Sequence, residues 1–305
     1  MKGNFLKTVA LLLIFLFCLC GCGKNESTQT NASAGESISS EYNYSSIEEI
    51  SSNEAASEIS SEAASLDDSS VQNNSSDNSS SVKSDNSSSS NIYNTQNGEK
   101  ICYLTFDDGP SKLTPQILSV LAKYDVKATF FVAGTSSLEY VKNIQRAGHT
   151  IGLHTDTHDW EIYKSETAYF TDLYEISNKV YNYVGFHSKI IRFPGGSSNK
   201  KSIDQCVGIM TKLTKKVEMQ GFVYVDWNVD SGDASDKNVP KSKILSNIKA
   251  QSKDKDLVCV LMHDTTSKQT TLDALPEIIE YYKAEGYRFE ALKTTSPVFH
   301  HNINN

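Results

Sequence analysis

The chain has 305 residues, 38% of them hydrophobic, and a formal net charge of −8, so it can hold a globular domain and further segments. The negative charge is concentrated in residues 24–98, which contain twelve acidic residues and two lysines, whereas residues 99–305 are close to neutral. Neither part carries the basic surplus of a nucleic-acid-binding surface, so we expect no nucleic-acid partner.

Residues 1–21 have the layout of a secretory signal. Two lysines precede an apolar run from Val9 to Leu19, which is too short for a comfortable membrane span. The run ends in L-C-G-C, which resembles the bacterial lipobox, where cleavage falls before the last cysteine and a lipid is attached to it. We predict a lipoprotein signal peptide, a lipidated Cys22 and a location on the outer face of the bacterial cytoplasmic membrane. An ordinary signal peptide and a secreted protein are the alternative.

Residues 22–98 form a low-complexity segment. Serine occupies 25 positions between residues 24 and 98, and aromatic or aliphatic periodicity is almost absent. Such a segment buries too little apolar surface to offset the entropy of ordering its backbone. We predict a disordered acidic tether with a root-mean-square reach of roughly 50 Å.

From residue 99 onward, short apolar runs alternate with helical patterns, which is typical of a sheet covered by helices. Because the runs are apolar throughout, they predict parallel strands that are buried on both faces. The seven predicted strands are 101–106, 126–132, 150–153, 190–193, 222–227, 257–262 and 287–292. The predicted helices are 116–124, 138–146, 166–183, 203–219, 241–251 and 272–284.

This alternation predicts an α/β fold, a distorted or incomplete (β/α) barrel of about seven strands over residues 99–295, preceded by the tether. Residues 296–305 are expected to form a polar C-terminal tail, and the protein to be a monomer. Apart from the two cysteines of the signal and Cys22, which would be lipidated, three cysteines remain, namely Cys102, Cys206 and Cys259. An odd number argues against a disulfide framework, although the sequence leaves one pair possible.

Polar clusters follow the predicted strands at their carboxyl ends, where such barrels place their reactive residues. D-D follows the first strand, H-T-D-T-H the third and D-W-N-V-D-S-G-D the fifth, while Arg192 and His263 lie at the ends of the fourth and sixth. Two histidines four residues apart, joined by a carboxylate from another strand, could supply three metal ligands and leave positions for water and substrate. A second carboxylate could then act as general base, and a separate histidine as acid.

Five motifs occur in order across residues 99–293, namely T-F-D-D-G-P, H-T-D-T-H, R-F-P-G, W-N-V-D-S and L-M-H. Their order and approximate spacing resemble those of the NodB-like polysaccharide deacetylases, carbohydrate esterase family four. The resemblance implies a distorted (β/α) barrel and a hydrolase that uses one divalent metal ion to remove acetyl groups from chitin-like sugars, peptidoglycan or xylan. Zinc is the expected metal, with cobalt, manganese and nickel as alternatives.

The resemblance also implies roles for single residues. Asp108, His154 and His158 would hold the metal, and Asp107 would be the general base. Arg192 would position Asp107 and tune its pKa through a charge-assisted hydrogen bond.

On the other side of the site, His263 would be the acid that protonates the leaving amine. Asp230 would orient His263 and raise its pKa, a role for which Asp233 in the same motif is the alternative. The backbone N–H of Gly195 would stabilise the oxyanion, and Leu261 would line the pocket for the acetyl methyl group.

The sequence departs from the family pattern at two positions. Gly195 stands where the third motif usually has a tyrosine, and Ala234 stands where the fourth motif usually ends in tryptophan. Both replacements are expected to open the substrate groove. Trp160 is a candidate aromatic residue at the rim of the site, with packing as an equal alternative, whereas Trp227 is expected mainly to pack.

The function expected from this sequence is metal-dependent deacetylation of an N-acetylated cell-wall glycan, with the lipid anchor as the membrane contact. An O-acetyl esterase acting on xylan or another glycan, or an amidase for small amides, is the alternative enzyme. A carbohydrate-binding relative without activity is the alternative of a different class, and the retained carboxylates and histidines argue against it.

Overall fold

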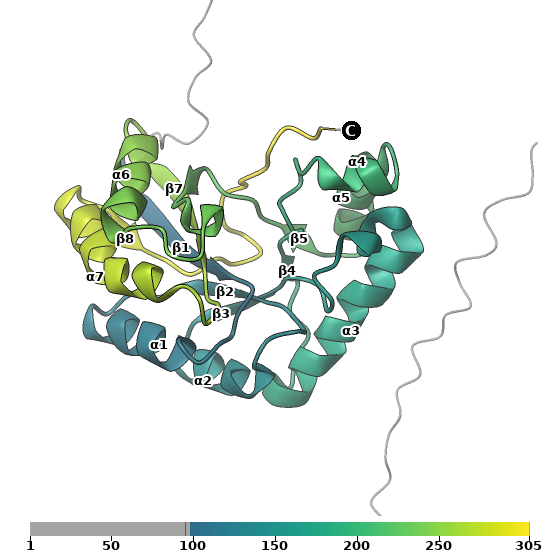
Figure 1. Ribbon diagram of the computed structural model, residues 1–305, viewed down its shortest axis with the longest axis horizontal. Coiled ribbons are helices and arrows are strands. Elements are labelled where there is room, and N and C mark those ends of the chain that lie inside the picture. Colours follow the sequence, from purple (N-terminus) through teal and green to yellow (C-terminus); the bar gives the residue numbers. More distant parts are fainter. Residues whose placement is uncertain (1–94, 96–97, 305) are drawn as a thin grey trace, which may run out of the picture. The chain divides into compact units, whose positions relative to one another are not determined.

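The computed structural model describes residue 95 and residues 98–304 (Figure 1). The predicted signal peptide, the lipidated Cys22 and nearly all of the predicted tether lie outside the described residues. Within the described part, no helix is both long enough and apolar enough to cross a membrane.

Eight parallel strands form one sheet in the described domain, in the order β5-β4-β3-β2-β1-β7-β6, with β8 paired to the start of β1. The strands curl toward one another with helices outside them (Figure 1), which confirms the predicted incomplete (β/α) barrel. The strands are β1 (Ile101–Asp107), β2 (Thr129–Val132), β3 (Thr150–Leu153), β4 (Ile190–Ile191), β5 (Val223–Tyr224), β6 (Val229–Asp230), β7 (Leu257–His263) and β8 (Arg288–Phe289).

The strand predicted over 222–227 was wrong in its extent, because only β5 forms there and β6 follows as a separate strand. Between them the chain crosses from the β4 side of the barrel to the β7 side. Val225 N–H donates to the carbonyl of Ile191 at 2.9 Å, and Asn228 N–H donates to the carbonyl of Cys259 at 3.2 Å. The two end strands of the sheet are thereby joined by a short crossing segment.

Seven α-helices and three short 3-10 helices cover the sheet in the described residues. The helix predicted over 203–219 is two helices, because the chain turns at Gly208, where φ is +78°. The α-helices are α1 (Thr114–Lys123), α2 (Val141–Arg146), α3 (Glu166–Val184), α4 (Lys201–Gln205), α5 (Ile209–Met219), α6 (Lys241–Ser252) and α7 (Gln269–Ala284). The 3-10 helices are η2 (Leu138–Tyr140), η3 (Trp160–Lys164) and η4 (Asp233–Ser235).

The buried side chains form a large cluster between sheet and helices and a smaller cluster that includes Tyr103, Phe131 and Phe299. Strand residues alternate between the two faces of the sheet, so Tyr103 shares the inner face of β1 with Asp107. Gly152 has no side chain because the ring of Phe131 occupies the space that its Cβ would need. Apolar side chains therefore fill the inner face of the sheet beneath the residues at the carboxyl ends of the strands.

The segment over 296–305, expected to be a polar tail, is exposed at 297–298 and 302–304 but is anchored to the domain through Phe299. Phe299 is fully buried against Tyr103, with a ring-centroid distance of 5.8 Å, and its carbonyl accepts a hydrogen bond from Asp226 N–H. His301 N–H donates to the Asp226 carboxylate at 2.8 Å. Because the barrel is incomplete, its inner apolar face needs a cover, and the C-terminal segment supplies part of it. Among the described residues, Cys102, Cys206 and Cys259 are free, so no disulfide links them.

Candidate active site

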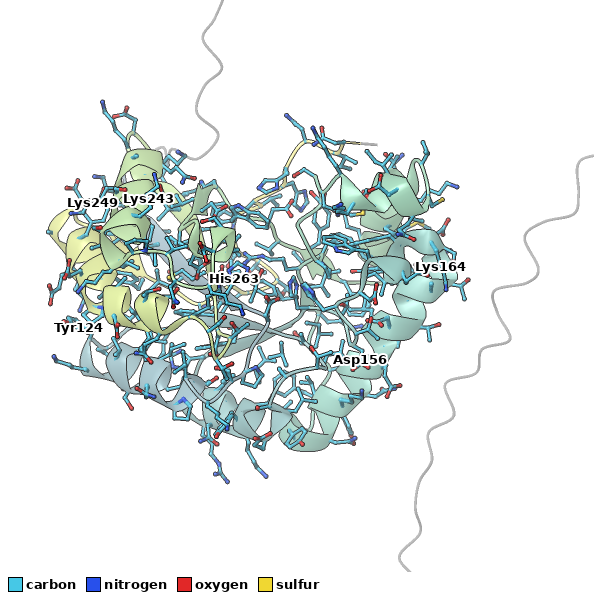
Figure 2. The ribbon with its side chains drawn as sticks, viewed as in Figure 1. Tyr124, Asp156, Lys164, Lys243, Lys249 and His263 are labelled. Carbon is cyan, nitrogen blue, oxygen red and sulfur yellow. The ribbon has the colours of Figure 1, made fainter. Side chains whose placement is uncertain are left out.

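The carboxyl ends of neighbouring strands bring the predicted polar residues together. Asp107 and His263 are register partners at the ends of β1 and β7. His154 directly follows β3, and Arg192 directly follows β4. In Figure 2, His263 lies near the middle of the domain, whereas Asp156 lies beside α3. Side chains far apart in the sequence thus share one end of the barrel.

Asp108, His154 and His158 form a cluster with the dimensions of a metal site. Asp108 Oδ1 lies 3.5 Å from His154 Nε2 and 3.2 Å from His158 Nε2, and one ligand atom from each residue lies within 4.8 Å of the others. Asp108 Oδ1 is buried and has no hydrogen-bond partner among the described residues. Since a buried carboxylate oxygen without a partner is costly, a cation bound between these three residues fits the site.

His154 is held in the form that can bind a cation. Its Nδ1 lies 2.8 Å from the carbonyl oxygen of Arg192, so Nδ1 carries the proton and Nε2 presents a lone pair to Asp108. Burial lowers the pKa of His154 to about 3, with a further contribution from His158, which keeps the imidazole neutral. A neutral imidazole with a fixed tautomer is the ligand form that divalent metals require.

Asp107 is a buried carboxylate with one oxygen held and one oxygen facing the metal cluster. Arg192 Nη1 donates to Asp107 Oδ1 at 2.9 Å, while Oδ2 lies 3.7 Å from His154 Nε2. Burial raises the pKa of Asp107, and the Arg192 charge opposes part of that rise. A carboxylate with a raised pKa and one unheld oxygen can accept a proton from water.

Arg192 is fully buried, and its guanidinium is satisfied on every side. Nη1 donates to Thr105 Oγ1 as well as to Asp107, and the ring of Phe131 lies 4.2 Å from the guanidinium carbon. Nε and Nη2 donate to the carbonyls of the crossing segment, Val225 at 2.9 Å and Asp226 at 2.8 Å. These carbonyls turn inward to the guanidinium instead of extending β5, which is why the predicted strand ends early.

The residue that holds His263 is Asp233, so the prediction of Asp230 for this role was wrong. Asp233 Oδ1 lies 2.7 Å from His263 Nδ1, and Asp233 Oδ2 accepts from His263 N–H at 2.9 Å and from Thr271 Oγ1 at 2.8 Å. Asp230 instead accepts from Gly232 N–H at 2.7 Å. At Gly232, where φ is +72°, the chain leaves β6 and enters η4, which carries Asp233 to the end of β7.

The environment of His263 favours the protonated imidazole. Burial by itself lowers the pKa of His263, but the hydrogen bond and charge of Asp233 outweigh burial, helped by the charges of Asp107 and Asp108, and raise the pKa to about 9. The pKa of Asp233 is lowered, because the interactions with His263 and Thr271 outweigh its burial. A protonated histidine beside a buried carboxylate base is the pair that general acid–base catalysis requires.

Another buried aspartate, Asp264, holds the turn that follows Asp108. Asp264 accepts hydrogen bonds from Ser111 Oγ at 2.9 Å and from Thr114 Oγ1 at 2.5 Å, and its backbone N–H donates to the carbonyl of Asp107. Gly109 lies so close that an added Cβ would come within 2.9 Å of the Asp264 side chain. Nothing in the sequence motif pointed to Asp264, although it directly follows His263.

The two positions where the sequence departs from the family pattern differ in their surroundings. Gly195 lies exposed in the turn after β4, at a φ of +73°, and a Cβ added there would lie 3.0 Å from the Trp160 ring. The Trp160 ring thus occupies the space that a side chain at position 195 would enter. Ala234 is exposed beside Asp233. Leu261 is buried on β7, two residues before His263 and on the same face of the strand.

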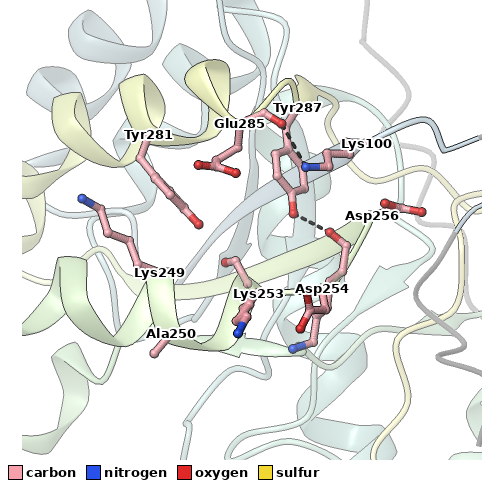
Figure 3. Close-up of a pocket in the computed structure, with 11 residues that line it drawn as sticks. Lys100, Lys249, Ala250, Lys253, Asp254, Asp256, Tyr281, Glu285 and Tyr287 are labelled. Carbon is pink, nitrogen blue, oxygen red and sulfur yellow. Dashed lines mark hydrogen bonds between the residues drawn. The ribbon is translucent and has the colours of Figure 1, made fainter. Parts of the chain in front are cut away.

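A polar cavity of about 580 Å³ lies at the opposite, amino-terminal end of the strands (Figure 3). Lys100 and Asp256 precede β1 and β7, and Tyr287 precedes β8. Lys100 donates to the carbonyl of Glu285, and Tyr287 donates to the carbonyl of Lys255, so these polar groups satisfy one another. The cavity contains none of the residues described above.

Comparison with known proteins gives one consistent result. The family model described as polysaccharide deacetylase matches residues 94–209. A peptidoglycan-N-acetylglucosamine deacetylase of Bacillus cereus is 33% identical over 199 residues, which are 63% of this chain and 69% of that protein.

Solved structures give the same result. The catalytic domain of a peptidoglycan N-acetylglucosamine deacetylase from Eubacterium rectale is 42% identical, with a TM-score of 0.65 over 70% of this chain and 97% of that one. A polysaccharide deacetylase from Bacillus cereus is 33% identical, with a TM-score of 0.58 over 66% and 97% of the two chains.

Proposed function

Because this chain belongs to the polysaccharide deacetylase family and is a hydrolase of amide bonds, we propose that it removes acetyl groups from the N-acetylated glycan of the cell wall, using one divalent metal ion. The observation that carries this proposal is the buried, unpartnered Asp108 Oδ1 between two histidine nitrogens. Asp107 and His263 lie beside it on neighbouring strands, as a base and an acid. Zinc is the proposed metal, because imidazole and carboxylate ligands in a three-residue set suit it.

The proposed division of labour assigns each residue one task. A divalent cation held by Asp108, His154 and His158 would polarise the acetyl carbonyl and lower the pKa of a neighbouring water. Asp107 accepts a proton from the attacking water through its unheld oxygen, while Arg192 keeps the other oxygen fixed.

His263 then donates its proton to the leaving nitrogen, and Asp233 stabilises the charged imidazole before that transfer. The backbone N–H of Gly195 donates to the oxygen on which negative charge develops, and Leu261 contacts the acetyl methyl group. The negative charge on this oxygen therefore develops next to a donor that is already oriented toward it.

The proposed substrate and location support each other. Two of the relatives named above are peptidoglycan N-acetylglucosamine deacetylases, and a lipid on Cys22 would place this chain on the outer face of the cytoplasmic membrane. A Ser-rich tether between anchor and domain would let the domain reach the wall glycan. We propose that the enzyme works there as a monomer.

The proposal is tested by measuring acetate release by the full chain. Substrates are N-acetylglucosamine oligomers, peptidoglycan and acetylxylan, each assayed with a chelator and again after adding Zn²⁺, Co²⁺ or Mn²⁺. We expect release from the N-acetylated glycans that stops with the chelator and returns with metal. Release from acetylxylan alone would make the protein an O-acetyl esterase. No release from any substrate in the presence of metal would refute the activity.

The two neighbouring aspartates give a sharper test of the mechanism. Asp108→Ala should lower metal affinity, whereas Asp107→Asn should abolish turnover and leave metal affinity nearly unchanged. Isothermal titration with Zn²⁺ measures the first effect, and acetate release at saturating metal measures the second. Equal loss of metal binding in both variants would show that the two carboxylates do not have separate tasks.

A further inference from the structure

The loop that connects His154 to His158 has an unusual backbone. Thr155 has a φ of +67° and His158 a φ of +53°, and both are left-handed conformations that non-glycine residues rarely adopt. Such conformations are strained and persist only where surrounding contacts hold them. The loop therefore needs an external support.

Helix α3 supplies the first part of this support through Asp172. Its carboxylate accepts hydrogen bonds from the backbone N–H groups of Asp156 and Thr157, and from the Thr157 hydroxyl at 2.7 Å. One side chain thus holds two consecutive peptide N–H groups of the loop. No metal-cluster residue is among these partners, so these contacts act on the loop and not directly on the ligand atoms.

Lys179 supplies the second part, two turns farther along α3. Its Nζ lies 2.8 Å from both carboxylate oxygens of Asp156. The loop is also held from the β2 side, where Gly134 N–H donates to the carbonyl of Thr155 at 3.1 Å. Asp156 occupies the space that a Cβ on Gly134 would need. The loop tip is therefore held on both sides.

The two histidines depend on this support to different degrees. His154 is buried, and the carbonyl of Arg192 fixes its ring. The side chain of His158 is 33% exposed, and the ion-pair contact that positions it within the site is the one with Asp108 at 3.2 Å. The position of His158 is therefore set mainly by the backbone of the loop that carries it.

We propose that Asp172 and Lys179 are positioning residues that hold the His154–His158 loop in the conformation that completes the metal site. This inference rests on the proposed metal-dependent function and adds two residues outside the five motifs to it. Removing either contact lets the loop relax toward ordinary backbone angles, which moves His158 Nε2 away from Asp108. Outer residues that orient metal ligands typically contribute 10–100-fold to metal affinity.

The test is metal binding by the full chain, measured as competition for Zn²⁺ with a chromophoric chelator. Asp172→Ala should weaken Zn²⁺ binding about 10–100-fold, and Asp172→Asn, which keeps one acceptor oxygen, should weaken it less. Lys179→Met should have a smaller effect in the same direction. Thermal unfolding without metal shows that each variant is folded.

A spectroscopic measurement separates positioning from a general loss of stability. The visible Co²⁺ spectrum of Asp172→Ala should move toward that of His158→Ala, because both lose the same ligand. Thr157→Val changes the loop side of the contact and leaves α3 intact, and it should shift the Co²⁺ spectrum in the same direction. It replaces Asp172→Ala in the experiment if that variant is too unstable to assay.

A pair on the same helix provides the matched control. Glu166 of α3 binds Lys216 of α5 at 2.7 Å, and both are part-buried like Asp156 and Lys179. Glu166→Ala should leave Zn²⁺ affinity and the Co²⁺ spectrum unchanged. Wild-type Zn²⁺ affinity in folded Asp172→Ala and Thr157→Val would overturn this inference and leave the proposed function standing. An equal loss of Zn²⁺ affinity in Glu166→Ala would do the same. A wild-type chain that binds neither Zn²⁺, Co²⁺ nor Mn²⁺ overturns the proposed function as well.

Discussion

Replacing Asp233 by asparagine should move the alkaline limit of the activity. His263 has a pKa of about 9 because the hydrogen bond and charge of Asp233 outweigh its burial. Asparagine keeps an acceptor oxygen for His263 Nδ1 and removes the negative charge. Since burial lowers the pKa of an imidazole, the pKa of His263 in Asp233→Asn should fall to the ordinary value of about 6.5 or below.

The size of the effect follows from the protonated fraction of the acid. At pH 8 a group with a pKa of about 9 is roughly nine-tenths protonated, whereas one with a pKa of about 6.5 is only about 3% protonated. Activity at pH 8 should therefore fall about 30-fold. At pH 5.5 both forms are mostly protonated, so the loss there should be less than about 1.5-fold. The direction is fixed, because an acid catalyst loses activity as pH rises through its pKa.

The assay is kcat/KM for acetate release from an N-acetylglucosamine oligomer between pH 5 and pH 10, at saturating metal. Asp230→Asn is the matched control, because Asp230 accepts from Gly232 N–H and does not contact the imidazole. In Asp230→Asn, kcat/KM should decline at high pH over the same range as in the wild-type enzyme. An alkaline limb near pH 9 in Asp233→Asn, or an equal shift in Asp230→Asn, would refute the assignment of Asp233 as the partner of His263.

Three further outcomes are expected. Arg192→Met should cost about 3–5 kcal/mol in denaturant unfolding, because it leaves Asp107 buried without its partner, and should move the acid limb of the pH profile upward as the pKa of Asp107 rises. An unchanged acid limb would contradict this. Phe299→Ala should cost about 3–5 kcal/mol in the same measurement, whereas Ile303→Ala, at an exposed position, should cost less than about 0.5 kcal/mol; equal effects would show that the C-terminal segment is only a tail. Trp160→Ala should raise KM for a glycan oligomer about fivefold, equivalent to ~1 kcal/mol, and leave KM for a small aryl acetate unchanged; an equal rise for both substrates would exclude a sugar contact.

Much of this protein follows from local sequence patterns. Continuous apolar runs between helical stretches predict parallel strands, and parallel strands place their carboxyl ends at one edge of the sheet. Side-chain alternation along β1 and β7 then puts Asp107 and His263 on the same inner face, as register partners. The grouping of the two histidines with Asp108 could be predicted for the same reason, because each follows or ends a strand.

The tertiary structure decided the rest, because those features depend on how segments distant in sequence pack together. Asp230 and Asp233 are three residues apart, and only the turn at Gly232 determines which of them reaches His263. Phe299 is buried because the barrel is incomplete, and Asp172 supports the histidine loop because α3 lies against it. Sequence periodicity identifies which face of an element is apolar, but which side chain fills a given space is set by the distances between elements after they pack.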